Sequence, residues 1–158
     1  SGASVLLDNL LDLGYNQITA SDINSKGLQK SQERLGERAN KITWIVDDLC
    51  NPKVLNEIEQ VDLWHDRAVL HFFTEKKDRQ TYFELLDKKV KRGGQVILAV
   101  FSTKTAKKCS GLVLKQYDKD LLCEFLGKEY ELLEHFNYNY TMPSGDVREY
   151  IYTRFKKI

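Results

Sequence analysis

The chain has 158 residues, a length typical of one domain. Hydrophobic residues make up 42% of it and charged residues 30%, with 9 Gly and 2 Pro, which excludes collagen-like, low-complexity and largely disordered classes. The 24 basic and 23 acidic side chains almost balance, so charge gives no argument for nucleic acid or an anionic membrane as a partner. No apolar run approaches the roughly 18 residues that cross a bilayer.

The three cysteines, Cys50, Cys109 and Cys123, lie far apart in the sequence and form no Cys-x-x-Cys pair. Neither a disulfide framework nor a zinc site is expected from this pattern, and no other metal site is predicted. The cysteine usage favours a reducing compartment, so we expect a cytoplasmic protein.

Apolar residues at helical spacing alternate with short β-prone runs through the first part of the chain. Gly14 and Gly36 stand where helix C-terminal caps belong, and Ser25 can cap the second helix. The elements predicted there are, in chain order, a helix over 5–13, a strand over 18–21, a helix over 25–35, a strand over 42–46 and a helical turn around 54–58.

The second part continues this alternation and then departs from it. Residues 95–101 are almost continuously apolar, which is typical of a central strand buried on both faces. About ten residues separate the last two strands, too few for a parallel crossover, so these strands should pair antiparallel. The elements predicted there are a strand over 61–64, a helix with its apolar face at 82–90 and a glycine stop at 93–94, a strand over 95–101, a helix over 118–126, and strands over 130–137 and 147–155.

This order predicts an α/β, Rossmann-like fold, with a mostly parallel central sheet flanked by helices and a C-terminal antiparallel hairpin. Residues 1–158 are expected to form a single domain.

Several residues at the predicted strand and helix ends suit an adenosine-containing ligand. Gly2, Ala3 and Ser4 open the first helix, where free backbone N–H groups favour an anionic group. Asp22 follows at the spacing of a carboxylate that binds a ribose diol, and Asp48 can accept a hydrogen bond from an adenine amino group. Taken singly, these residues also fit an ordinary N-cap loop and turn-forming aspartates.

A second group, Asp66, Arg67 and His71, follows the strand that begins near residue 61. In an open parallel sheet, ligands bind beyond the carboxyl ends of the strands, so this group should face the reacting end of a ligand. The alternative is an Asp66–Arg67 ion pair that fastens the loop, with His71 as a half-buried structural histidine. His65 and His135 are interpreted as structural.

With these residues, the chain resembles the class I S-adenosylmethionine-dependent methyltransferases over nearly its whole length. Three matches concern the cofactor: residues 2–4 resemble the tail of the glycine-rich loop, Asp22 the acid that binds the ribose, and Asp48 the adenine contact. Three concern the sheet: residues 62–67 resemble the family's fourth motif, 91–95 the turn into its fifth strand, and the C-terminal hairpin its reversed seventh strand. The resemblance implies S-adenosylmethionine as the cofactor and S-adenosylhomocysteine as its product. It also assigns Ile23, Leu49 and Asp66 to cofactor binding.

The family's first strand and leading glycines would precede Ser1. We therefore expect an N-terminally truncated methyltransferase domain, from which the upstream segment has been omitted.

Methyl transfer from a sulfonium is an in-line displacement, so the enzyme mainly aligns the reactants and excludes water. We expect Asp66 and His71 to orient or deprotonate the acceptor, with His71 as the better general base, and Arg67 to hold a polar or anionic part of it. Tyr117 and Ser110 are further candidates at the acceptor mouth. The acceptor itself is a small molecule or a protein side chain, and the oligomeric state stays open.

Two alternatives remain at this point. A nicotinamide-dependent oxidoreductase would use Gly2 and Asp22 equally well, because both suit either dinucleotide. A catalytically silent binding module could carry the same fold.

Overall fold

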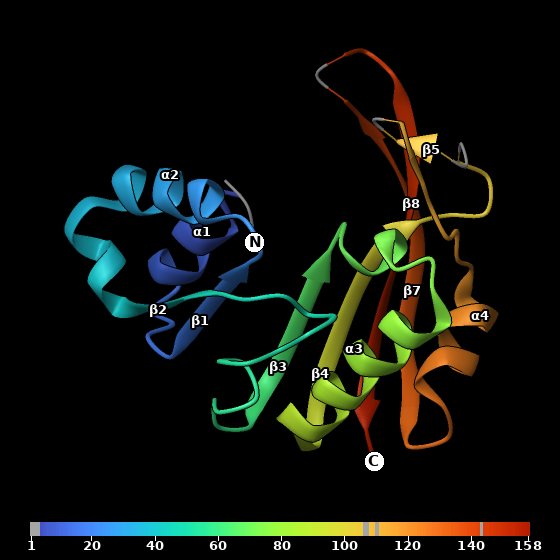
Figure 1. Ribbon diagram of the computed structural model, residues 1–158, viewed down its shortest axis with the longest axis horizontal. Coiled ribbons are helices and arrows are strands. Elements are labelled where there is room, and N and C mark those ends of the chain that lie inside the picture. Colours follow the sequence, from blue (N-terminus) through green and yellow to red (C-terminus); the bar gives the residue numbers. More distant parts are fainter. Residues whose placement is uncertain (1–3, 106–107, 110, 143) are drawn as a thin grey trace. The chain divides into compact units, whose positions relative to one another are not determined.

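The computed structural model describes residues 4–105, 108, 109, 111–142 and 144–158. The chain divides into two compact units, residues 1–58 and 59–158, and each unit has its own sheet (Figure 1).

The first unit consists of helices around a two-stranded parallel sheet. Its elements are α1 (Leu6–Asp12), β1 (Ile18–Asp22), α2 (Ser25–Leu35), the 3-10 helix η1 (Gly36–Lys41) and β2 (Ile42–Val46). Leu7, Ala20, Leu35 and Ile42 pack together as its core. The predicted helices and strands are thus confirmed, with one correction: Asn24 rather than Ser25 caps α2, because the Asn24 side chain accepts the Lys26 N–H at 2.9 Å.

The second unit holds the rest of the chain in a four-stranded sheet. Its elements are β3 (Val61–Arg67), the 3-10 helix η2 (Leu70–Phe72), α3 (Lys76–Lys89), β4 (Val90–Phe101), β5 (Lys108–Cys109), β6 (Leu112–Val113), α4 (Lys119–Leu126), β7 (Tyr130–Thr141) and β8 (Val147–Lys157). The short β5–β6 hairpin was not predicted.

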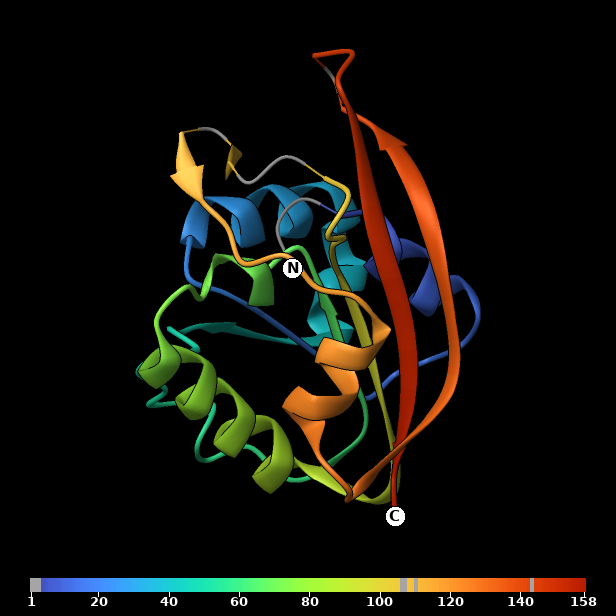
Figure 2. The same cartoon turned by 90° about the vertical axis from the view of Figure 1, so that its right-hand side faces the viewer.

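This sheet has the order β3-β4-β8-β7, and its strand directions are mixed. β3 and β4 are parallel, whereas β8 is antiparallel to both β4 and β7, so the predicted C-terminal hairpin is confirmed. The sheet is mixed rather than mostly parallel because the hairpin contributes two of its four strands. Figure 2 shows α3 and α4 side by side against one face of it.

Several strands are longer than predicted, among them β7, which runs to Thr141, and two differences bear on the site and its neighbouring strands. β3 runs on through Asp66 and Arg67, so these residues belong to the strand and not to a loop after it. The prediction that the glycine pair 93–94 stops the helix is wrong, because α3 ends at Lys89 and both glycines lie inside β4. A Cβ on Gly94 would lie 3.1 Å from the Asp62 carbonyl oxygen, so glycine permits a close approach of β4 to β3.

Candidate functional site

Asp22 and the Asp47–Asp48 pair lie at the same edge of the first unit's sheet. β1 and β2 are parallel with Asp22 opposite Val46, and the Asp47 N–H donates to the Asp22 carbonyl oxygen at 3.2 Å. The Asp22 carboxylate accepts the Asn24 N–H at 2.8 Å. Ile23, next in the chain, is 70% exposed, and Leu49 is half-buried. The geometry therefore places the backbones of these two strand ends side by side.

The two adjacent aspartates have different roles in the loop after β2. The Asp47 carboxylate accepts backbone N–H groups from Lys53 at 2.9 Å, Leu55 at 2.8 Å and Asp48 at 3.0 Å. Burial raises the pKa of Asp47, but these N–H groups bring it below its usual value overall. The Asp48 carboxylate accepts only the Cys50 N–H, at 2.8 Å, among the hydrogen bonds of the described residues. Asp47 thus shapes the loop that presents Asp48.

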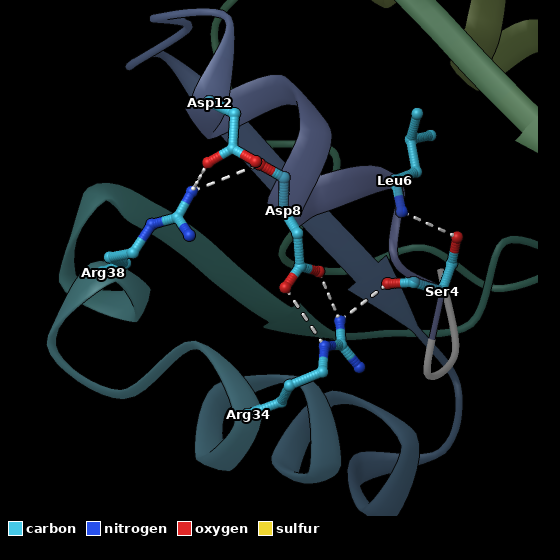
Figure 3. Close-up of polar contacts among 6 residues, drawn as sticks. All are labelled: Ser4, Leu6, Asp8, Asp12, Arg34 and Arg38. Atoms are coloured by element: carbon cyan, nitrogen blue, oxygen red, sulfur yellow. Dashed lines mark hydrogen bonds and ion pairs between the residues drawn. The ribbon is translucent and has the colours of Figure 1, made fainter.

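Ser4, at the start of the first helix, is held in place by α2 (Figure 3). Its hydroxyl accepts the Leu6 N–H at 3.2 Å, and its carbonyl oxygen accepts from Arg34 Nη2 at 2.8 Å. The same guanidinium group pairs with the Asp8 carboxylate at 2.8 Å. Gly2 and Ala3, predicted with Ser4 to bind the cofactor, lie outside the described residues, as does Ser110.

Asp66 of β3 is buried under α3. It is 5% exposed, and its Oδ2 accepts the Tyr82 hydroxyl at 2.7 Å, which in turn accepts the Trp64 indole N–H at 3.2 Å. Its Oδ1 has no hydrogen-bond partner among the described residues. Burial raises the pKa of Asp66 to about 6, against the lowering effects of the Tyr82 hydroxyl and of the backbone N–H groups of Leu70 and Val69, which approach the carboxylate without a hydrogen bond of normal geometry to Oδ1. Asp66 is therefore an acid whose charge changes just below neutral pH.

Arg67 lies on the opposite face of β3, because side chains alternate along a strand. Its Nε donates to the Tyr152 hydroxyl at 3.1 Å, and its guanidinium carbon is 5.0 Å from the Tyr140 ring centroid and 5.5 Å from that of Tyr150. The ion pair between Asp66 and Arg67, weighed as the structural alternative, is not formed. The next residue, Ala68, has a φ of 65°, a strained conformation of the kind that concentrates at functional sites.

His71 is buried, with 1% exposure, and stacks on Phe101 at a centroid distance of 4.3 Å. Its Nδ1 accepts the Phe101 N–H at 3.2 Å, so the neutral ring carries its proton on Nε2. Nε2 has no hydrogen-bond partner among the described residues. Burial lowers the pKa of His71 to about 4, so the ring is neutral at pH 7. These contacts favour a hydrogen-bond donor over the general base expected from sequence.

Three buried polar atoms near the carboxyl ends of β3 and β4 have no hydrogen-bond partner among the described residues. They are Asp66 Oδ1, His71 Nε2 and the hydroxyl oxygen of Tyr117. Buried polar groups are nearly always hydrogen-bonded, so such a concentration is typical of a site that a ligand or ordered water completes. Sequence reasoning missed Trp64 and Tyr82, which hold Asp66. Trp64 and Asp66 are two positions apart on one strand, so the sequence could have placed them on the same face of the sheet. Tyr82 was interpreted only as one apolar residue of a helix face.

A family model described as "Methyltransferase domain" matches residues 1–98. The chain belongs to this methyltransferase family. Among curated proteins, nothing matches the chain.

Solved structures agree on the fold of this methyltransferase. An S-adenosylmethionine-dependent methyltransferase from Methanosarcina mazei superposes with a TM-score of 0.79 at 13% identity, over 99% of this chain and 89% of that one. The N-methyltransferase NodS from Bradyrhizobium japonicum gives 0.74 at 15% identity, over 99% and 82%. The 1,6-didemethyltoxoflavin-N1-methyltransferase from Burkholderia thailandensis, with its substrate and S-adenosylhomocysteine bound, gives 0.68 at 17%, over 99% and 68%.

The predicted Rossmann-like methyltransferase fold, the enzyme class and S-adenosylmethionine as the cofactor are thereby confirmed. The oxidoreductase and the silent binding module are set aside. The described residues of the first unit fit the adenosine part of the cofactor chemically, because Asp22 and Asp48 offer carboxylate acceptors for a ribose diol and an adenine amine. They include no cluster of side chains that could hold a metal ion.

Proposed function

We propose that this enzyme transfers the methyl group of S-adenosylmethionine to a small-molecule acceptor, with residues 1–158 acting as one methyltransferase domain. The unpartnered Oδ1 of the buried Asp66 is the observation that carries the proposal, because it is an acceptor for a proton near the carboxyl end of β3.

In this proposal the first unit recognises the adenosine part. Asp22 accepts hydrogen bonds from the ribose hydroxyls, and Asp48 accepts one from the adenine amino group. Ser4, with Gly2 and Ala3, lies at the methionine side, and Ile23 and Leu49 provide apolar contact with adenine. The half-exposed Leu49 and the exposed Ile23 support this assignment, since both are apolar surface beside the two carboxylates.

The reaction itself forms one bond and breaks one. The acceptor's lone pair attacks the methyl carbon, the carbon–sulfur bond breaks, and its electron pair stays on sulfur. An acceptor that begins protonated must also lose a proton, and Asp66 is placed to receive it, since a carboxyl group whose pKa lies near 6 is mostly ionised at pH 7. His71 donates a hydrogen bond through Nε2, and Arg67 holds a polar part of the acceptor.

A small molecule is favoured over a protein side chain because one structural neighbour, the Burkholderia thailandensis enzyme, binds the small molecule 1,6-didemethyltoxoflavin. The cytoplasm stays the expected compartment, supported by the free thiol of Cys123. Within the described residues, no helix is both long and apolar enough to cross a membrane.

Calorimetric titration of S-adenosylhomocysteine, S-adenosylmethionine and NAD into the chain tests the cofactor assignment. We expect micromolar binding of the two sulfur ligands, no binding of NAD, and a rise in Kd of about tenfold for Asp22→Asn. Binding of neither sulfur ligand overturns the proposal.

The acceptor class is tested with S-adenosylmethionine that carries a tritiated methyl group. The label should enter a deproteinised small-molecule extract and not a dialysed protein extract. Label found only in protein would replace the small-molecule acceptor by a side chain.

A further inference from the structure

A groove of about 440 Å³ lies between α3 and α4 in the second unit, apart from the residues assigned above to the cofactor. Three cationic side chains line it, Lys76, Arg79 and Lys115, against one carboxylate, Glu124. None of the three cations has an ion-pair partner within the part of the chain that the structure describes. In a protein whose charges otherwise balance, this local excess favours an anionic ligand.

Arg79 is fixed in position rather than free to sweep over the surface. Its Nη1 donates to the carbonyl oxygens of Phe73 at 2.9 Å and Thr74 at 2.5 Å, just before α3 begins. A guanidinium group held this way loses little conformational entropy when it binds an anion.

Tyr117 supplies a hydroxyl group at the same groove. The residue is 1% exposed, its hydroxyl has no hydrogen-bond partner among the described residues, and the Lys115 ammonium lies 5.3 Å from its ring centroid. Burial raises the pKa of Tyr117 well above the ordinary value, so the hydroxyl stays protonated and can donate to an anion. After burial, the positive charge of Arg79 lowers this pKa and the Asp66 carboxylate raises it.

Aromatic side chains form the apolar part of the groove. Phe83 of α3 and Phe125 of α4 meet edge to face, with centroids 5.8 Å apart and planes at 71°. Such a wall suits a flat ring better than a flexible chain.

We propose that this groove binds an aromatic ring that carries an anionic group, a carboxylate or a phosphate, and so selects acceptors of that class. The inference rests on the proposed function for its role, although binding at the groove needs no methyl donor.

Binding is therefore measured without the cofactor, by ligand-detected NMR with 4-hydroxybenzoate, phenyl phosphate and the uncharged benzyl alcohol as probes. We expect at least one of the two anions to bind below about 5 mM, and the tighter one to identify the anionic group. Benzyl alcohol should bind at least about fivefold more weakly.

The variant that tests the groove is Lys76→Gln with Lys115→Gln, because neither side chain donates a hydrogen bond within the described fold. Its matched control removes the same two charges from exposed positions outside the groove, Lys77→Gln with Lys128→Gln. We expect the first pair to raise the Kd of the anion about tenfold and the second to leave it within about twofold. Tyr117→Phe should weaken binding about threefold through the lost donor.

The proposed anion site would be contradicted by any of three results. These are an equal loss of anion affinity in both double variants, binding of benzyl alcohol as tight as that of the anions, and no binding of either anion. Titration of S-adenosylhomocysteine into the same variants keeps the two proposals apart, because cofactor binding should be unchanged in all of them. A chain that binds the anion but not S-adenosylhomocysteine retains the groove and loses the methyltransferase role.

Discussion

The aspartates that end strands in the two units have opposite surroundings. Asp22 and Asp48 of the first unit are half-buried and accept backbone N–H groups from their own loops. Asp66 of the second unit is almost fully buried, accepts a tyrosine hydroxyl, and keeps one oxygen without a partner among the described residues. The first arrangement holds a carboxylate in place through its own loop, whereas burial in the second raises the pKa of the carboxyl group to about 6.

In our proposal, this difference separates two tasks of the enzyme, recognition of the cofactor and exchange of a proton with the acceptor. Recognition of hydroxyl and amino groups needs a permanent acceptor, which local N–H groups supply at little cost. Exchange of a proton near neutral pH needs a group whose pKa lies near that pH, and burial creates such a group from Asp66. The raised pKa means that the ionised carboxylate lowers stability at neutral pH, which is the cost that our proposal assigns to proton exchange.

Asp66→Asn gives the largest expected effect, because it leaves the shape and removes the proton acceptor. Turnover of a protonated acceptor should fall about a hundredfold or more, while the Kd of S-adenosylhomocysteine stays within about threefold. Radiometric turnover and calorimetry check the two values. Unchanged turnover would remove Asp66 from the proposed catalytic group.

The pH dependence of stability distinguishes Asp66 from His71, because the two groups change the free energy of unfolding in opposite directions over the same pH range. Between pH about 4 and 6 the folded chain holds a proton on Asp66 that the unfolded chain has released, so the free energy of unfolding falls as pH rises. Between pH about 4 and 6.5 the unfolded chain holds a proton on His71 that the folded chain lacks, so the free energy rises. Each contribution is about 3 kcal/mol, and together they nearly cancel.

Single variants should reveal the contribution of each group to the pH dependence of the unfolding free energy. Urea unfolding from pH 4 to pH 7 measures it. Relative to the wild type, Asp66→Asn should gain stability by about 3 kcal/mol as pH rises across this range, and His71→Asn should lose a similar amount. The remaining carboxyl groups titrate alike in all three proteins and drop out of the comparison. Parallel curves would show that neither group is perturbed as its burial indicates.

Asp47 and Asp48 allow a smaller test within the first unit. Asp48→Asn should raise the Kd of S-adenosylhomocysteine about tenfold with little change in stability, since its carboxylate faces the ligand in our proposal. Asp47→Asn should lower the free energy of unfolding by about 1–3 kcal/mol, because three backbone N–H groups lose a charged acceptor. Calorimetry and urea unfolding would show the reverse pattern if Asp47 were the adenine contact.

The sequence predicted the elements well where their signals are local. The strands at Ile18–Asp22 and Ile42–Val46 and the helix at Lys119–Leu126 follow from β-prone runs, an N-cap aspartate and closing glycines. The antiparallel hairpin followed from loop length alone. The error at Gly93–Gly94 arose because glycine marks both a helix stop and a close approach between strands, and only the neighbouring strand decides between them.

The sequence proposes residues for the candidate site, but it does not predict their surroundings. Asp66, Arg67 and His71 were found from their place after a strand, yet their burial and their separation onto two faces depend on where β3 ends. The role of Tyr82 depends on a contact between residues 16 positions apart, which no local pattern reports.

Arg34 forms an ion pair with Asp8, a carboxylate that takes no part in the proposed site, so it serves as a purely structural case beside Asp22, Asp48 and Asp66. It donates to Asp8 through Nε and Nη2 and to the Ser4 carbonyl oxygen, whereas Arg38 makes one bond to the exposed Asp12 and one to the Asp8 carbonyl oxygen. The Arg34 hydrogen bond lowers the pKa of Asp8, so this contribution is present above the usual pKa of an aspartate and is lost as pH falls.

Arg34→Gln should therefore lower the free energy of unfolding by about 1 kcal/mol at pH 7, and by less at pH 3, while the matched Arg38→Gln costs about half as much. Hydrogen exchange of the α1 amides should quicken in the first variant, since Arg34 ties the start of α1 to α2 (Figure 3). Equal effects of both variants would mean that the Ser4 contact adds nothing to the general attraction between the helices. A larger effect of Arg34→Gln on cofactor affinity than on stability would instead make the start of α1 part of the binding site, as predicted for Ser4.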